Sequence, residues 1–309
     1  MENIAIATPI WESQPLSQAC GETVLLKMEA LQPCGSFKAR GMEAACRASL
    51  NAGATRVICA SGGNAGYAVA YVGRRLGLGV TIVVPETTSS RASELIRREG
   101  ADLVVHGAAW EASYAYATEL VRSTGGRIVH SFDDPHVWSG NAGIIDEIAG
   151  KGIRPAAVVL SVGGGGLLCG IAQGLSAAGW NDVPILAVET EGTASFAASM
   201  QAGQLVTLER TSSIATSLAA RTVARQALEW ARRRPIISCV VTDRQALDAC
   251  LHFADEHRVL VEPACGASLA VLRGNTSHLK AKSPVVVVVC GGVGVNRQLL
   301  DKWDREIPK

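Results

Sequence analysis

The sequence carries almost no net charge, since its 29 basic and 28 acidic residues leave only +1. Proteins that bind nucleic acid or an anionic membrane usually carry a clear basic excess, so partners of these two kinds are not expected. Long apolar runs are missing as well, because the longest aliphatic stretch, Val285–Val289, is far too short to span a bilayer. The first residues, Met1-Glu2-Asn3, do not resemble a signal peptide. These absences predict a cytoplasmic protein.

The cysteine and histidine patterns typical of disulfide frameworks and metal sites are also missing. The nine cysteines are an odd number, and no two of them stand in C-x-x-C spacing. This argues against a disulfide framework and against a thiolate zinc site. The six histidines are scattered, and none forms an H-E-x-x-H motif. We therefore expect most cysteines to be reduced and buried as small apolar side chains.

The chain has instead the composition of a globular enzyme, with 48% apolar and 18% charged residues. Short aliphatic runs alternate with helical patterns almost throughout, which predicts an α/β fold with mainly parallel sheets. The predicted strands are Val24–Met28, Arg56–Ala60, Val80–Val84, Ala157–Ser161, Ile185–Glu189, Ile236–Val241 and Val285–Cys290. Predicted helices include Ala65–Leu76, Leu167–Ala178 and Arg244–His257.

A tetraglycine, Gly163-Gly164-Gly165-Gly166, follows the predicted strand Ala157–Ser161 and opens a predicted helix. Exposed backbone N–H groups and the helix dipole make such a junction an anion site suited to phosphate. A dinucleotide fold is one alternative, because Glu189 closes the next strand at about the distance of a ribose-binding acid. Counted from Gly163, however, the third glycine of a G-x-G-x-x-G motif is replaced by Leu168. The motif alone predicts a phosphate site without identifying the ligand.

Lys38 stands at the start of another predicted helix, within Pro33-Cys34-Gly35-Ser36-Phe37-Lys38-Ala39-Arg40. The positive end of a helix dipole disfavours a cation, so it would lower the pKa of this amine. A lysine with a lowered pKa can act as a nucleophile or form a Schiff base. An ordinary exposed lysine is the alternative interpretation.

Three motifs together resemble those of the fold-type II pyridoxal-phosphate enzymes. Ser36–Arg40 is similar to the Schiff-base lysine motif, Ser61–Gly66 to the substrate-carboxylate loop, and Gly163–Gly166 to the phosphate loop. Within this family the chain looks most like the animal-type L-serine dehydratases and their dehydratase-like paralogue. The resemblance runs from Thr8 to Gly292 and includes Phe132–Pro135, Glu262–Gly266 and Val289–Gly292.

The resemblance implies a two-domain layout like that of the tryptophan synthase β subunit. Residues 1–34 and 136–309 would form a large cofactor-binding domain, and residues 35–135 a small domain that closes over the substrate. A homodimer is expected from the family.

The resemblance also implies roles for individual residues. Lys38 would hold pyridoxal 5'-phosphate and, with Ser61, would serve in catalysis. Phe37 would pack near the ring, Asn64 would bind the 3'-oxygen of the ring, and Cys290 would face the ring nitrogen. The phosphate would be bound by Gly163, Gly164, Gly165, Gly166 and Leu167. The substrate, a small amino acid, would be bound by Ser61, Gly62, Gly63, Asn64 and Ala65.

Potassium or a similar monovalent cation is a further implied ligand, near the phosphate loop. The positions that match the family's cation site are Glu189, Thr193, Ser195, Leu218 and Ala220. Thr193 replaces an alanine of the family, and because backbone carbonyls do much of that coordination, the change is expected to be tolerated.

The expected reaction is β-elimination of water and ammonia from L-serine, with L-threonine as a second candidate substrate, in amino-acid degradation. The alternatives are a threonine dehydratase, a serine racemase, a β-replacement synthase, a nucleotide-binding module, and a degenerate cofactor-binding protein without turnover. The resemblance also implies elimination rather than racemisation, because similar serine racemases carry a serine at the position of Gly62 and glycine offers no second proton donor. Because glycine also loosens the substrate loop, Gly62→Ala is expected to raise turnover.

Overall fold

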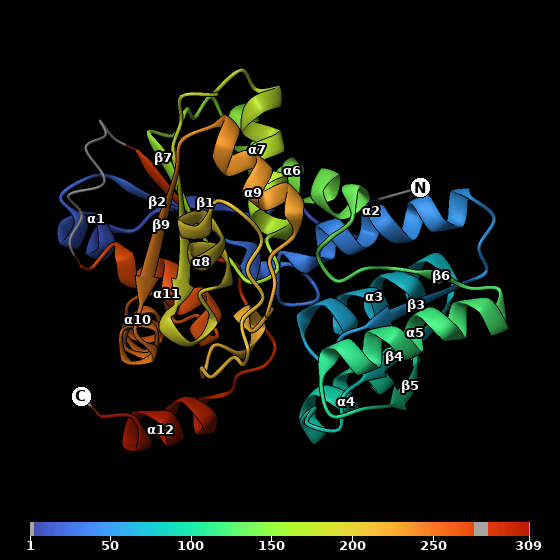
Figure 1. Ribbon diagram of the computed structural model, residues 1–309. Helices are drawn as coiled ribbons and strands as arrows, with labels where there is room; N and C mark the ends of the chain where they lie inside the picture. The colour runs from blue at the N-terminus through green and yellow to red at the C-terminus, as the bar shows by residue number, and fades with distance from the viewer. Residues whose placement is uncertain (1–2, 275–283, 309) are drawn as a thin grey trace.

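The computed structural model describes residues 3–274 and 284–308 and contains two mainly parallel sheets in two halves of the molecule (Figure 1). The larger sheet has six strands in the order β1-β2-β10-β7-β8-β9, and only β1 is antiparallel to its neighbour. Its strands are β1 (Ile10–Glu12), β2 (Val24–Lys27), β10 (Val285–Val288), β7 (Ala157–Ser161), β8 (Ile185–Thr190) and β9 (Ile236–Val241).

The smaller sheet is wholly parallel and has four strands in the order β5-β4-β3-β6. These strands are β5 (Asp102–Val105), β4 (Gly79–Val84), β3 (Arg56–Ala60) and β6 (Arg127–Ile128). The prediction of an α/β fold with mainly parallel sheets is therefore confirmed.

Helices connect the strands and cover the sheets. They are α1 (Gln14–Cys20), α2 (Lys38–Asn51), α3 (Asn64–Leu76), α4 (Ser90–Arg98), α5 (Trp110–Thr124), α6 (Pro135–Gly150), α7 (Gly166–Ala177), α8 (Ser195–Ala202), α9 (Arg225–Arg233), α10 (Asp243–His257), α11 (Pro263–Val271) and α12 (Arg297–Glu306). Short 3₁₀ turns are η1 (Glu29–Leu31), η2 (Glu191–Thr193) and η3 (Thr216–Leu218). Helix α2 packs against both α3 and α6, which places its N-terminus between the two halves (Figure 1).

Burial explains why the central strands are continuous aliphatic runs. Every residue of β10 is fully buried, because β2 and β7 flank it and helices cover the sheet. The predicted strands are all present, although β10 ends at Val288 rather than Cys290. Strands β1, β5 and β6 were missed, since they are short and much of their surface is exposed.

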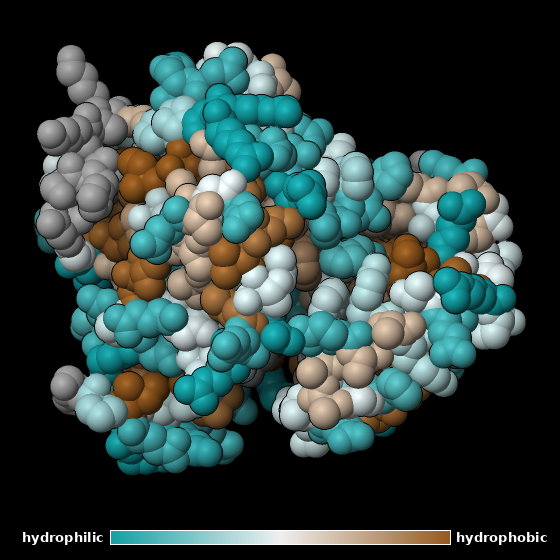
Figure 2. Space-filling model, viewed as in Figure 1, coloured by the Kyte–Doolittle hydropathy of each residue, from teal (hydrophilic) through white to brown (hydrophobic). Residues whose placement is uncertain are grey.

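The two sheets use separate stretches of the chain, since β3–β6 all lie between residues 56 and 128. The domain boundaries after residues 34 and 135 stay a prediction. Apolar side chains gather on the visible face of the half that holds the six-stranded sheet, whereas polar side chains cover much of the remaining surface (Figure 2). Across residues 3–274 and 284–308, none of the helices has the length and apolar character needed to span a membrane.

All nine cysteines are free thiols. Cys239 is half-buried and the other eight are buried. The prediction of reduced, buried cysteines is therefore confirmed.

Candidate active site

Lys38 is the first residue of helix α2, as the sequence predicts. The segment before it is fastened to the carboxyl end of β10, because the Phe37 N–H donates to the Cys290 carbonyl at 3.1 Å. Ser36 and Gly291 form an isolated β-bridge beside this contact. The helix start is thus held at the edge of the large sheet where ligands of parallel sheets usually bind.

The amine of Lys38 lies in a desolvated environment. Its Nζ donates to the Ser131 carbonyl at 2.7 Å and lies 5.1 Å from the centroid of the Phe37 ring. Burial lowers the pKa of Lys38 to about 8, although the nearby Glu262 carboxylate acts in the opposite direction. The sequence predicted a lowered pKa from the helix dipole, whereas burial is the main cause in the structure.

The tetraglycine loop joins β7 to α7 and forms a narrow cradle. Helix α7 has no side-chain cap at its N-terminus, so the amides of its first turn are available to an anion. A Cβ on Gly164 would lie 2.2 Å from Cγ of Phe132, and one on Gly163 would lie 2.8 Å from the Ser217 carbonyl oxygen. Gly165 has φ +87°, which favours glycine. Leu167, next in the helix, is buried.

The substrate loop predicted from the sequence follows β3. The Ser61 N–H donates to the Val83 carbonyl at 3.1 Å, and the Ser61 hydroxyl accepts from the Gly63 N–H at 3.3 Å. Ala65, in the first turn of α3, is buried. A Cβ on Gly62 would lie only 2.3 Å from Oγ1 of Thr88. The methyl group of Gly62→Ala would therefore require the Thr88 side chain or the loop to shift, and the expected gain in turnover stays a prediction.

Asn64 lies at the start of α3 and connects the two halves of the molecule. Its Nδ2 donates to Oε1 of Glu262 at 2.8 Å and to the Ser217 hydroxyl at 3.2 Å. Its Oδ1 accepts from the Val293 N–H at 2.9 Å. Neither Glu262 nor Ser217 was predicted as a site residue, and Glu262 was visible only as part of a family-like motif before α11.

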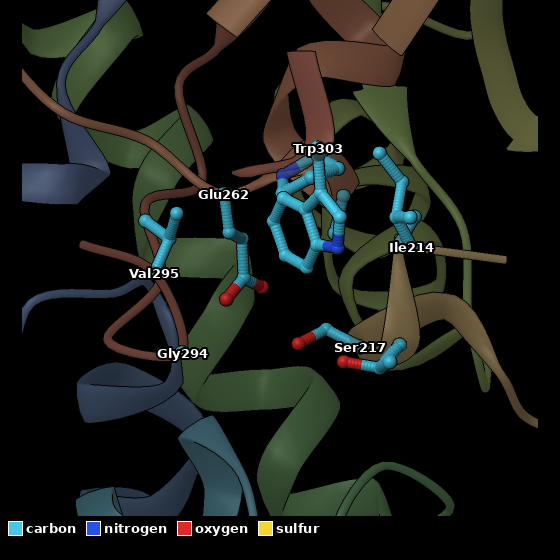
Figure 3. Close-up of a pocket in the computed structure, with 10 residues that line it drawn as sticks. Ile214, Ser217, Glu262, Gly294, Val295 and Trp303 are labelled. Atoms are coloured by element: carbon cyan, nitrogen blue, oxygen red, sulfur yellow. The ribbon is translucent and has the colours of Figure 1, made fainter. Parts of the chain in front are cut away.

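Glu262 also borders a small pocket with about 210 Å³ of space not filled by atoms, part of it open to solvent. Its carboxylate points into this pocket, toward the side on which Ser217 lies (Figure 3). Burial raises the pKa of Glu262, while hydrogen bonds from Ser217 and Asn64 oppose the shift. The pocket is lined by residues 214–217 and 262–264, Gly294, Val295 and Trp303.

Cys290 is buried just after β10. A hydrogen bond with the Cys265 thiol, followed by burial, raises the pKa of Cys290 far above its ordinary value. The side chain is therefore a neutral thiol at physiological pH.

Two parts of the structure hold the predicted cation residues. Glu189, Thr193 and Ser195 lie around the N-terminus of α8, where the Glu189 carboxylate accepts from the Phe196 and Ala197 N–H groups, each at 2.8 Å. Burial raises the pKa of Glu189 to about 7. Leu218 and Ala220 lie in and after η3, with Leu218 against Gly163. Within the residues that the structure describes, no three His, Cys, Asp or Glu side chains form a metal site.

These residues fit a phosphate-bearing aldehyde cofactor. The glycine cradle suits a phosphate, and the desolvated amine of Lys38 suits a carbonyl carbon. Two hydroxyls are buried without a hydrogen-bond partner in the described part of the chain. They belong to Ser36, two residues before Lys38, and to Ser161, at the end of β7. Buried polar atoms of this kind are usually satisfied by water or a ligand.

Comparison with known proteins agrees with this geometry. The family model described as "Pyridoxal-phosphate dependent enzyme" matches residues 2–291. The chain is 45% identical to "Serine dehydratase-like" of Rattus norvegicus, over 97% of this chain and 94% of that one. It is 42% identical to "L-serine dehydratase/L-threonine deaminase" of Homo sapiens, over 96% and 93% of the two chains.

A solved structure of similar fold is that of an L-serine ammonia-lyase from the fungus Rhizomucor miehei. It superposes with a TM-score of 0.91 at 36% identity and covers 99% of this chain and 100% of that one. Because the family model and these relatives span nearly the whole sequence, the chain belongs to the family of pyridoxal-phosphate dependent enzymes.

Proposed function

We propose that this protein is a lyase that converts L-serine to pyruvate and ammonia, with L-threonine as a second substrate. The observation that carries the proposal is the desolvated amine of Lys38, whose pKa is about 8, at the centre of the candidate active site. The names of the rat, human and fungal relatives point to the same reaction.

Bound pyridoxal phosphate would draw electrons away from the substrate Cα and so weaken its Cα–H bond. Lys38 would hold the cofactor until the amine of the substrate displaces it, and the freed Lys38 amine would then accept the proton from Cα. Residues 163–167 would bind the phosphate, Phe37 would pack near the ring, and Asn64 would bind the ring oxygen. Because Cys290 is a weakly acidic thiol, it would leave the ring nitrogen unprotonated. That favours prompt loss of the β-hydroxyl over longer-lived carbanion chemistry.

The substrate would be oriented by the loop after β3. Ser61, Gly62, Gly63, Asn64 and Ala65 would hold the substrate carboxylate and so align the Cα–H bond with the amine of Lys38. Glycine at position 62 supplies no side-chain acid on the opposite side of Cα. A racemase needs a proton donor there, so elimination is the favoured outcome.

Incubation with L-serine is expected to release pyruvate and ammonia in equal amounts, and L-threonine should yield 2-oxobutyrate more slowly. Chiral chromatography of the remaining serine distinguishes elimination from racemisation. The proposal is wrong if D-serine accumulates as fast as pyruvate, and a threonine dehydratase is favoured if L-threonine is consumed faster. No turnover of either substrate despite bound cofactor would indicate a degenerate cofactor-binding protein.

A potassium ion or similar monovalent cation is proposed at Glu189, Thr193, Ser195, Leu218 and Ala220. The Ser195 hydroxyl is buried without a partner in the described residues, and the buried Glu189 carboxylate would be stabilised by a positive charge. Because η3 contacts Gly163, a cation there would also stabilise the phosphate loop. The Thr193 hydroxyl is hydrogen-bonded to the Thr190 hydroxyl at 2.7 Å. Because this bond satisfies the additional hydroxyl, threonine at position 193 is compatible with the cation site.

Activity is accordingly expected to be several-fold higher in potassium chloride than in sodium or lithium chloride at one ionic strength. Glu189→Gln removes the charge that would bind the ion, so this variant should lose the difference between the salts. Initial rates of pyruvate release measure both effects. Equal wild-type rates in all three salts would argue against the cation site.

The same proposal includes two domains, with boundaries after residues 34 and 135. The small domain would close over the substrate. The contacts of Asn64 with Glu262 and Ser217 cross between the two sheets and support it. A homodimer and a cytoplasmic location stay predictions.

A further inference from the structure

His130 is a half-buried residue to which no role has yet been assigned. It lies between β6 and α6, and its ring meets the edges or faces of three aromatic rings. The ring centroids lie 4.6 Å from Phe132, 5.0 Å from Tyr114 and 5.7 Å from Trp110, at steep interplanar angles of 86°, 72° and 76°. Aromatic pairs favour such edge-to-face arrangements. The imidazole is therefore held in one orientation by its neighbours.

Two backbone amides define the protonation state of this imidazole. Nδ1 accepts hydrogen bonds from the Asp133 N–H at 2.7 Å and from the Phe132 N–H at 3.2 Å. A ring nitrogen that accepts a hydrogen bond does not carry a proton, so the proton of the neutral ring must be on Nε2. Burial, together with the nearby charge of Lys38, lowers the pKa of His130 to about 4. The ring thus remains a neutral acceptor at physiological pH.

The turn that His130 holds reaches both essential parts of the candidate active site. The Ser131 carbonyl, within this turn, accepts the hydrogen bond from Nζ of Lys38 at 2.7 Å. The Phe132 ring covers Gly164 of the phosphate loop so closely that a Cβ there would lie 2.2 Å from it. On the other side, the Phe132 carbonyl accepts from Nε1 of Trp138 at 2.8 Å, which fastens the turn to α6.

We propose that His130 is a positioning residue for Lys38. Its neutral imidazole accepts hydrogen bonds from the two amide N–H groups. These bonds keep the Ser131 carbonyl against Nζ of Lys38 and the Phe132 ring against Gly164. In the described part of the chain the hydrogen bonds of the His130 ring run to the amides of the turn and not to the amine or the glycine loop, so it acts through the turn. The inference rests on the proposed function only in taking Lys38 as the amine that moves the Cα proton.

Three substitutions at this one position separate the acceptor role from simple packing. An asparagine places its Oδ1 near the position of Nδ1, so His130→Asn retains an acceptor for the two amides. In His130→Gln the side chain is of similar polarity, but its amide lies beyond the position of Nδ1. In His130→Ala the side chain has no hydrogen-bond acceptor. His136→Ala is a matched control, because His136 is an exposed histidine near the same turn.

His130→Ala and His130→Gln are expected to lower kcat for L-serine by roughly ten- to a hundredfold, since small displacements of a reacting group have effects of this size. The KM for L-serine should change less than kcat, because the turn is hydrogen-bonded to Lys38 and to α6 rather than to residues 61–65. His130→Asn should restore kcat to within a few-fold of the wild type, and His136→Ala should leave it unchanged. Rescue by asparagine but not by glutamine is a result that a general loss of stability does not produce.

A second measurement does not depend on the proposed reaction. The apoenzyme is mixed with pyridoxal phosphate, and the visible absorbance that accompanies attachment to Lys38 is followed with time. Attachment should be slower in His130→Ala and His130→Gln and restored in His130→Asn. If the wild type shows no lyase activity but this order holds, the proposed function fails while the positioning role stands. Equal behaviour of asparagine and glutamine variants, or wild-type rates in His130→Ala, would overturn the positioning role.

Discussion

Replacing Lys38 with alanine is expected to lower kcat by at least about 10⁴-fold, because the change removes both the covalent anchor for the cofactor and the acceptor of the Cα proton. Lys38→Arg should be nearly as inactive, since a guanidinium keeps the positive charge but does not deprotonate in a protein. Lys151→Ala is the matched control, because Lys151 is exposed at the end of α6. Pyruvate release and bound-cofactor absorbance measure the loss.

The lowered pKa of Lys38 also predicts a pH dependence. An amine attacks a carbonyl only in its unprotonated form, so attachment of pyridoxal phosphate to the apoenzyme should accelerate as pH rises toward about 8 and then level off. An ordinary lysine would give the same rise only near its unperturbed pKa of about 10.4. Borohydride reduction and peptide mass spectrometry should place the cofactor on Lys38. An adduct on another lysine would refute the assignment.

Gly164→Ala is expected to have the second-largest effect, through affinity for pyridoxal phosphate. The added Cβ would lie 2.2 Å from Cγ of Phe132, so either the aromatic ring or the phosphate loop must move. Overpacking of this kind typically costs about 1–3 kcal/mol, which corresponds to roughly a five- to 150-fold loss of affinity. Equilibrium titration of the apoenzyme with pyridoxal phosphate measures it.

Two controls test whether the clash is the cause of this loss. Gly150→Ala places a methyl group where no atom lies within 4 Å, so it should leave affinity unchanged. In a double-mutant cycle, Phe132→Ala removes the ring that the methyl would strike, so Gly164→Ala should cost much less in that background. If Gly164→Ala is harmless in the wild type, or equally harmful in both backgrounds, steric exclusion by Phe132 is not the reason for glycine at this position.

The buried strands were the part of the fold that the sequence predicted most readily. Val285–Val288 and residues 157–160 are continuous aliphatic runs because parallel strands in the middle of a sheet are covered on both faces. The edge strands β1 and β5 escaped prediction because exposure removes that pattern. Gly165 and Lys38 were visible for a different reason, since each lies at the start of a helix, a local feature with its own residue preferences.

The contacts that assemble the candidate site are not local. Asn64 meets Glu262 across 198 positions, and Lys38 meets Ser131 across 93. No periodicity or spacing in the sequence encodes such pairs, because the packing of the two sheets brings them together. Thr88 illustrates the consequence, since its side chain would have to shift to admit the alanine that the sequence favoured at position 62.

By itself, the sequence determined the α/β architecture, the helix starts that carry the lysine and the glycine loop, and a resemblance to one enzyme family. Each of these depends on residues close together in the chain, whose pattern is imposed by burial or by backbone conformation. Only the tertiary structure decided that burial depresses the pKa of Lys38, that Glu262 and Ser217 engage Asn64, and that His130 holds the turn against the amine. These properties depend on desolvation and on neighbours that folding alone supplies.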